Sequence, residues 1–221
     1  MITSGHNDLK EVLRGEARRR ASLWVKDEAR VRTEQEQLNK RLTEFLLQQS
    51  EPGDGIALFA GRGAELRLEA TARSIHAEGR VVYLPRILTR VKEGAKMGFA
   101  PVIPGGGEFK EWDLELQAWG IPEPPQADVS VLEGDAQGKL TWLVLPCLLG
   151  DEDYYRVGHG GGYYDRFTAS LRSQGRPCRF MLPRLSWQIS EDALPRDPWD
   201  IPADIGLTVS APHPSAGTQS F

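Results

Sequence analysis

RVGHGGGYYDR, residues 156–166, is the stretch on which the prediction of the fold depends. It holds four glycines, two arginines, two tyrosines and an aspartate. Glycines let backbone N–H groups approach a phosphate, arginines supply charge-assisted donors, and a carboxylate can hold a divalent cation on the phosphate oxygens. Apolar residues 143–146 before the run predict a buried strand, and residues 163–172 can form a helix. A strand, a glycine turn and a helix N-terminus together predict a phosphate site.

The glycine spacing by itself leaves two interpretations open. It matches neither the dinucleotide-binding fingerprint nor the P-loop, because no Lys-Ser or Lys-Thr follows the glycines. An ordinary glycine-rich turn exposed at the end of a strand explains the glycines as well as a phosphate cradle does.

Outside this run, the apolar periodicity predicts alternating helices and strands. Residues 7–49 are highly charged with apolar positions three or four apart, which is typical of two amphipathic helices. Residues 55–60, 65–77 and 80–84 read as strand, helix and strand, which predicts a parallel βαβ unit. Residues 178–182 and 205–209 add two further strands. We therefore predict one α/β domain over residues 1–210, with helices flanking a mostly parallel sheet in three layers, and a disordered tail over residues 211–221.

Residues 101–125 are rich in proline and glycine and predict a long irregular segment. The segment contains Trp112 and Trp119. Either indole can stack on a flat heteroaromatic ligand or pack the segment onto the core, and the sequence leaves both open.

Composition limits the classes of function. The chain has 221 residues, 40% of them hydrophobic and 26% charged, with a net charge of −4. Such a charge gives no overall attraction to nucleic acid or to a membrane. No apolar stretch approaches the roughly 20 residues that a membrane span needs, and no hydrophobic signal region begins the chain. We therefore expect a cytoplasmic protein without nucleic-acid or membrane partners, and treat the basic triplet at residues 18–20 as a solvated helix face.

The complete run, Arg-x-Gly-x-Gly-x-Gly-Tyr-Tyr-Asp-Arg, resembles the signature of the 5-formyltetrahydrofolate cyclo-ligase family, whose members are also called methenyltetrahydrofolate synthetases. Further landmarks of that family occur in the same order along most of the chain. They are the Lys10 and Arg14 pair, Glu65, the strand ending in Leu84-Pro85, Met97-Gly98-Phe99, Gly120-Ile121-Pro122-Glu123-Pro124, and the segment of residues 194–202 that contains Asp200.

The chain departs from the family pattern at a few positions near these landmarks. Gly150 replaces an aromatic residue, Tyr154 replaces a glycine, and Arg67 replaces an aspartate. His159 stands where the family has tyrosine or arginine. Its imidazole can donate to a phosphate or act as an acid, or it can simply take the place of a bulkier side chain that contacts substrate or solvent.

The resemblance implies an ATP- and Mg²⁺-dependent ligase that cyclises 5-formyltetrahydrofolate to 5,10-methenyltetrahydrofolate and releases ADP and phosphate. It implies ATP and Mg²⁺ as cofactors, a reduced folate as substrate, and a monomer or weak homo-oligomer. The alternative is a non-catalytic or retargeted relative that binds nucleotide or a folate-like ligand. This alternative is suggested by the departures from the family pattern at Arg67, Gly150, Tyr154 and His159.

The resemblance also implies roles for individual residues. It implies that Arg156 and Glu65 are catalytic and that Asp165 and Asp200 bind the metal. It implies that Glu65, Trp119 and Tyr163 bind the substrate. The residues implied in nucleotide binding are Lys10, Arg14, Arg156, Gly158, His159, Gly160, Gly161, Gly162, Tyr163 and Tyr164. Two of these roles have simpler alternatives, because Asp165 can be a first-turn helix carboxylate and Asp200 a surface turn aspartate.

Overall fold

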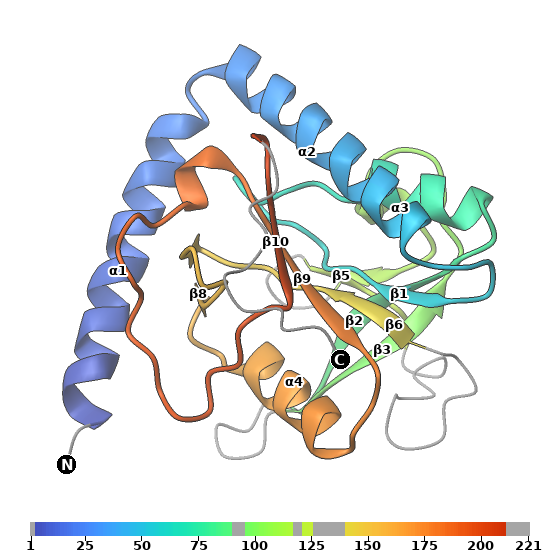
Figure 1. Cartoon of the computed structure of the whole chain (residues 1–221). Helices are drawn as coiled ribbons and strands as arrows, with labels where there is room; N and C mark the ends of the chain where they lie inside the picture. Colours follow the sequence, from blue (N-terminus) through green and yellow to red (C-terminus); the bar gives the residue numbers. More distant parts are fainter. Residues whose placement is uncertain (1–2, 90–95, 117–120, 126–139, 211–221) are drawn as a thin grey trace.

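The computed structural model describes the backbone of residues 3–89, 96–116, 121–125 and 140–210 (Figure 1). Its centre is a six-stranded sheet in the order β10-β9-β6-β1-β2-β3. Neighbouring strands are parallel except β3, which runs antiparallel to β2. The strands are β1 (Gly55–Ala57), β2 (Val81–Thr89), β3 (Lys96–Val102), β6 (Leu140–Val144), β9 (Arg179–Arg184) and β10 (Ile205–Thr208).

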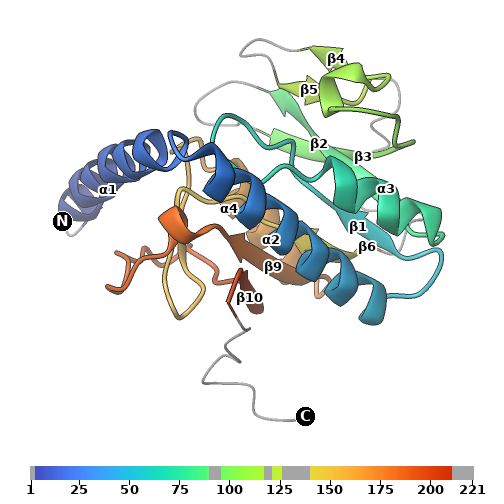
Figure 2. The same ribbon diagram turned by 90° about the horizontal axis from the view of Figure 1, so that it is seen from above.

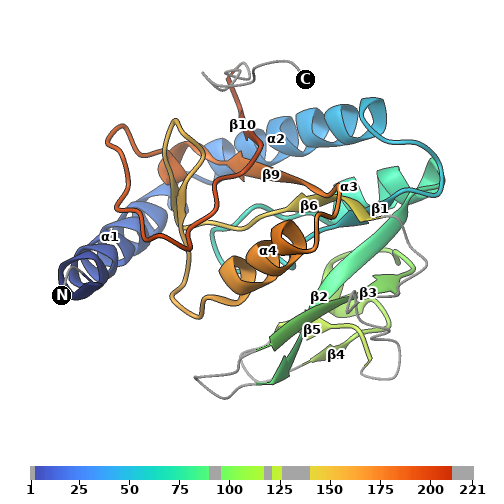
Figure 3. The same cartoon turned by 60° about the horizontal axis from the view of Figure 1, so that its bottom comes forward.

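In the described part of the chain, four helices surround this sheet. They are α1 (Thr3–Trp24), α2 (Glu28–Gln48), α3 (Glu69–Ala77) and α4 (Tyr163–Ser173). Helices α2 and α3 lie on one face and α4 on the other, while α1 projects past the sheet (Figures 2 and 3). The predicted three-layer α/β fold with a mostly parallel sheet is therefore confirmed. Within the described residues, no helix has both the length and the apolar character that crossing a bilayer requires.

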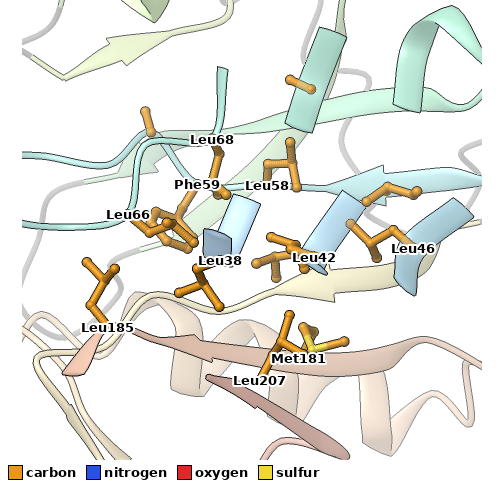
Figure 4. Close-up of a cluster of buried hydrophobic side chains, with 14 of the residues drawn as sticks. Leu38, Leu42, Leu46, Leu58, Phe59, Leu66, Leu68, Met181, Leu185 and Leu207 are labelled. Carbon is orange, nitrogen blue, oxygen red and sulfur yellow. The ribbon is translucent and has the colours of Figure 1, made fainter. Parts of the chain in front are cut away.

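The strands separate two apolar cores because alternate side chains point to opposite faces. Val144 packs into the core beneath α2, and its neighbour Leu143 packs into the core beneath α4. The larger core uses Leu38, Leu42 and Leu46, which lie four residues apart along one face of α2 (Figure 4). The second predicted amphipathic helix therefore buries its apolar face on the sheet, as its pattern indicates.

Several predicted boundaries were wrong. Strand β1 ends at Ala57 and α3 begins at Glu69, because the intervening residues form a turn in which Glu65 N–H donates to the Arg62 carbonyl. Strand β2 continues beyond Leu84 to Thr89, paired with β3.

The segment predicted to be irregular, residues 101–125, also contains regular structure. Strand β3 extends to Val102, and a short turn of 3-10 helix covers Phe109–Glu111. The strands β4 (Glu115–Leu116) and β5 (Pro122–Glu123) form a two-stranded pair. Trp112 is buried against Phe109, with ring centroids 4.7 Å apart, so this indole packs the segment onto the core. Trp119 and the predicted disordered tail lie outside the described residues.

The departures at Gly150 and Tyr154 belong to one packing arrangement. Tyr154 adopts a left-handed backbone, with φ of 64°, which explains why glycine suits this position in relatives. The Tyr154 ring fills the space above Gly206, where a Cβ atom would lie 2.4 Å from it. A Cβ at Gly150 would lie 2.7 Å from the Arg184 side chain, and that guanidinium sits 5.5 Å from the Tyr154 ring centroid. Arg184 therefore occupies the place that a side chain at residue 150 would need.

This packing predicts a stability change. Gly206→Ala is expected to lower the free energy of unfolding by about 1–3 kcal/mol, because the added methyl collides with the buried Tyr154 ring. Gly15→Ala in the interior of α1 is the matched control, since nothing lies within 4 Å of its added Cβ, and it is expected to stabilise by about 0.5–1 kcal/mol. Urea denaturation compares the two. An unchanged midpoint for Gly206→Ala would show that the Tyr154 ring can shift without loss.

Candidate active site

A cavity of about 490 Å³ lies where the parallel strands end. Its walls come from α1, the turn after β1, strands β2 and β3, the glycine run, and the segment before β10. In open α/β sheets, ligands bind outside the carboxyl ends of the strands, as here. The sequence-predicted residues that line this cavity are Lys10, Arg14, Glu65, Arg156, Gly158, His159, Gly160, Gly161, Gly162, Tyr163, Tyr164, Asp165 and Asp200. Trp119 is the predicted site residue outside the described structure.

The glycine run forms the turn that was predicted between strand and helix. Gly162 adopts a left-handed backbone, with φ of 62°, and is the N-cap of α4. Glycine has no side chain with which to cap the first amides of α4, and a helix N-terminus favours an anion. Gly160 has φ of 98°, and a Cβ there would lie 3.3 Å from the Arg14 guanidinium carbon. Glycine suits both positions by conformation, and at Gly160 the close approach of Arg14 also leaves little room for a side chain.

Each cation at this end of the cavity already has a carboxylate partner. Both Nη atoms of Arg156 donate to Oδ1 of Asp165, at 2.8 and 2.7 Å. Nζ of Lys10 donates to Oδ2 of Asp200 at 2.5 Å and to Oδ2 of Asp197 at 2.7 Å. Burial by itself lowers the pKa of Lys10, but its hydrogen bonds to the two aspartates outweigh burial and hold the pKa above 10.5.

Arg14 connects α1 directly to the glycine run. Its Nε donates to the Gly158 carbonyl at 3.0 Å, and its Nη1 donates to Glu11 at 2.9 Å. Lys10 lies one helical turn earlier and faces the segment before β10. The i, i+4 spacing therefore places both cations on the side of α1 that faces the cavity.

Glu65 meets the glycine run from the opposite wall. Its side chain is 9% exposed, its Oε2 accepts the Arg62 backbone N–H at 2.8 Å, and its Oε1 lies 3.0 Å from Nε2 of His159. Tyr164 lies beneath the loop, where burial and then the Glu65 charge raise the pKa of its hydroxyl well above the usual range. The Glu65 carboxylate is buried and Tyr164 is partly buried, whereas the His159 side chain is 61% exposed.

The donors present suit Mg²⁺ bound together with a phosphate. Mg²⁺ prefers oxygen ligands and commonly takes one or two carboxylates, several waters and substrate phosphates. Asp165 and Asp200 supply such oxygens within one cavity. Within the described residues, no group of three or more His, Cys, Asp or Glu side chains forms a metal site of protein ligands alone. The structure leaves the simpler alternatives geometrically intact, since Asp165 lies in the first turn of α4 and Asp200 accepts the Asp197 N–H in a turn.

Comparison with known proteins identifies the family. The sequence profile described as the 5-formyltetrahydrofolate cyclo-ligase family matches residues 6–209. This chain belongs to that family. The predicted family membership is therefore confirmed.

Individual cyclo-ligases share modest identity with this chain. The 5-formyltetrahydrofolate cyclo-ligase of Haemophilus influenzae is 25% identical over 172 residues, which cover 76% of this chain and 84% of that protein. The mouse enzyme is 25% identical over 120 residues, 51% of this chain and 52% of its own length. A probable cyclo-ligase of Schizosaccharomyces pombe is 31% identical over 64 residues, so the match spans only 29% of this chain and 30% of that relative.

Two solved structures of cyclo-ligases have the same fold. The 5,10-methenyltetrahydrofolate synthetase of Aquifex aeolicus superposes with a TM-score of 0.67 at 24% identity, covering 96% of both chains. The enzyme from Mycoplasma pneumoniae gives a TM-score of 0.60 at 18% identity, covering 91% of this chain and 99% of that one.

Apolar side chains also line this cyclo-ligase cavity, and sequence reasoning missed most of them. They are Phe59, Pro85, Ile87, Met97, Ile121 and Trp199. Pro85, Met97 and Ile121 lie in stretches that carry the family resemblance, which was the available signal. Trp199 is 55% exposed, and its position beside Asp200 was the only hint from sequence. Asp197, which holds Lys10, was also missed.

The departures from the cyclo-ligase pattern differ in their relation to the cavity. Gly150 and Tyr154 are absent from its lining and pack beside Arg184 inside the fold, as described above. Arg67 lines a separate cavity of about 310 Å³. His159 is the departure that lies in the main cavity.

Proposed function

We propose that this chain catalyses the ATP- and Mg²⁺-dependent cyclisation of 5-formyltetrahydrofolate to 5,10-methenyltetrahydrofolate, with release of ADP and phosphate. The observation that carries the proposal is that one cavity is lined by both charged and apolar residues. Its cations, the glycine run and the α4 N-terminus suit a polyphosphate. Its apolar side chains suit a flat heteroaromatic ring.

The chemistry explains why both ligands must share a cavity. A formamide oxygen is a poor leaving group, so attack of the neighbouring N10 on the formyl carbon is slow. Transfer of the γ-phosphoryl group to that oxygen gives an iminium phosphate, from which phosphate departs readily after N10 attacks. The protein has to align the two reactants and neutralise charge as it moves, with little covalent work of its own.

The residues take roles that follow from their positions. Lys10, Arg14 and Arg156 bind the polyphosphate, and the backbone N–H groups of the glycine run cradle it. Asp165 and Asp200 hold Mg²⁺, which supplies charge neutralisation at the phosphate oxygens. Because Asp165 is paired with Arg156 and Asp200 with Lys10, binding of Mg-ATP exchanges internal ion pairs for contacts with metal and phosphate.

The remaining residues of the cavity bind the substrate. Glu65 and Tyr163 contact the reduced folate, with Tyr164 packed below them and Trp119 as a further contact predicted from sequence. Cytoplasmic location and a monomeric or weakly associating state remain predictions from the sequence.

A spectroscopic assay tests the function. Protein mixed with 5-formyltetrahydrofolate and Mg-ATP is expected to produce methenyl absorbance in the near ultraviolet, with one ADP per product, and no product when ATP or Mg²⁺ is omitted. Binding of either ligand without product would favour the non-catalytic relative instead. Binding of neither ligand would exclude both functions.

A further inference from the structure

We infer that His159, oriented by Glu65, accepts the proton that N10 of the folate loses when the ring closes. The inference rests on the proposed function and adds a catalytic group to it. The backbone of residue 159 stays in the phosphate cradle, and only the imidazole takes this role.

Ring closure has to dispose of one proton. The formyl oxygen first forms a bond to the γ-phosphorus as the bond from phosphorus to ADP breaks. The N10 lone pair then forms the bond to the formyl carbon, and the π electrons of the iminium return to N5. The adduct carries a proton on N10 that must leave before phosphate is expelled with the electrons of its C–O bond. Transfer of that proton to an imidazole nitrogen balances the step.

The contact between His159 and Glu65 prepares the imidazole to accept a proton. Glu65 is held from below, since its Oε2 accepts the Arg62 N–H, and its Oε1 lies 3.0 Å from Nε2 of His159. A carboxylate cannot donate, so Nε2 carries the hydrogen in this contact and the lone pair of the neutral ring is on Nδ1. The same carboxylate stabilises the imidazolium formed after transfer, as the aspartate does in hydrolase triads. Among the described residues, Nδ1 of His159 has no hydrogen-bond partner.

Three of the carboxylates that line the cavity are already paired with cations. Asp165 is bound by Arg156, and Asp197 and Asp200 by Lys10. The Tyr164 hydroxyl has its pKa raised by burial, so it stays protonated and cannot serve as the acceptor.

Glu123, the remaining carboxylate of the lining, is 3% exposed and its Oε2 accepts the Ile87 N–H at 3.4 Å. Among the described lining residues, His159 supplies the one imidazole, and its side chain is 61% exposed.

Chemical rescue tests the proposal. His159→Gly is expected to lower kcat for methenyl formation by about 100-fold, the scale of general base catalysis, with little change in KM for ATP. Added imidazole is expected to restore part of the lost rate, because the side chain it replaces is open to solvent. His159→Arg keeps a long polar side chain that cannot accept a proton, and is expected to be as slow and not to respond to imidazole. His76→Gln, on the exposed end of α3, is the control and should match the wild type.

The possible outcomes separate the two proposals. Wild-type kcat in His159→Gly, absence of rescue in that variant with circular dichroism intact, or full activity in His159→Arg would each overturn the role of His159 and leave the cyclo-ligase function standing. A loss confined to KM for ATP would assign the imidazole to phosphate binding instead. If the wild-type protein forms no methenyl product, the proposed function fails and the inference with it.

Discussion

Asp165→Asn is expected to lower Mg²⁺-dependent methenyl formation by at least about 100-fold, because a metal at a transferring phosphoryl group contributes several kcal/mol of charge stabilisation. Asparagine keeps an oxygen that can accept from Arg156, and the Asp165 side chain is 34% exposed, so the fold should survive. The neutral amide is a far weaker Mg²⁺ ligand than the carboxylate. The measurement is the initial rate of ADP and methenyl formation against Mg²⁺ concentration, together with the melting temperature.

Asp27→Asn is the matched control for this change. Asp27 also lies at a helix N-terminus, where its side chain accepts the Arg30 N–H as the N-cap of α2, and asparagine caps helices equally well. The control is expected to keep both stability and turnover. Wild-type turnover and Mg²⁺ dependence in Asp165→Asn would show that Asp165 is only a first-turn carboxylate paired with Arg156.

Lys10→Met is expected to weaken ATP binding by about tenfold to 100-fold, since a hydrogen bond to a charged group is worth about 1.5–3 kcal/mol. Stability should also fall, by about 1–3 kcal/mol, because Asp197 and Asp200 lose the cation between them. The side chain of Lys10 is 10% exposed, so solvent screens the pair only partly. Isothermal titration with ATP and thermal unfolding measure the two effects separately.

The stability effect has a defined pH dependence. The pKa of Lys10 is raised in the folded protein, so its contribution is complete below the ordinary value of 10.5 and is lost as pH rises through the folded pKa. The difference in melting temperature between wild type and Lys10→Met should therefore persist at neutral pH and shrink in strong alkali.

Arg18→Ala is the matched control for Lys10→Met. Arg18 lies on α1 with its side chain 57% exposed and only a 3.6 Å contact to Glu11, so its loss should change neither affinity nor stability appreciably. A large loss of ATP affinity in Arg18→Ala would mean that the phosphate-binding cations lie further along α1 than Lys10 and Arg14.

Local signals in the sequence determined the type of fold and most of the polar residues of the site. Apolar periodicity is a property of neighbouring residues, so the helices of the first 49 residues, the parallel βαβ unit and the strand, glycine turn and helix around residue 160 were all predictable. The glycines and charges of the run indicate an anion for the same reason, since their chemistry lies within eleven consecutive residues.

Strand β3 and the pair of β4 with β5 were not predictable, because antiparallel pairing depends on a partner and not on the local composition. The contacts that complete the site join residues that are even farther apart in the sequence. His159 meets Glu65 across 94 residues, and Lys10 meets Asp197 across 187. The sheet order brings the ends of β1, β2 and β6 together and places apolar side chains in the same cavity as the glycine run. The sequence by itself determined which groups are available for the chemistry. Only the tertiary structure decided which of them touch, because parallel strands far apart in the chain end at the same edge of the sheet.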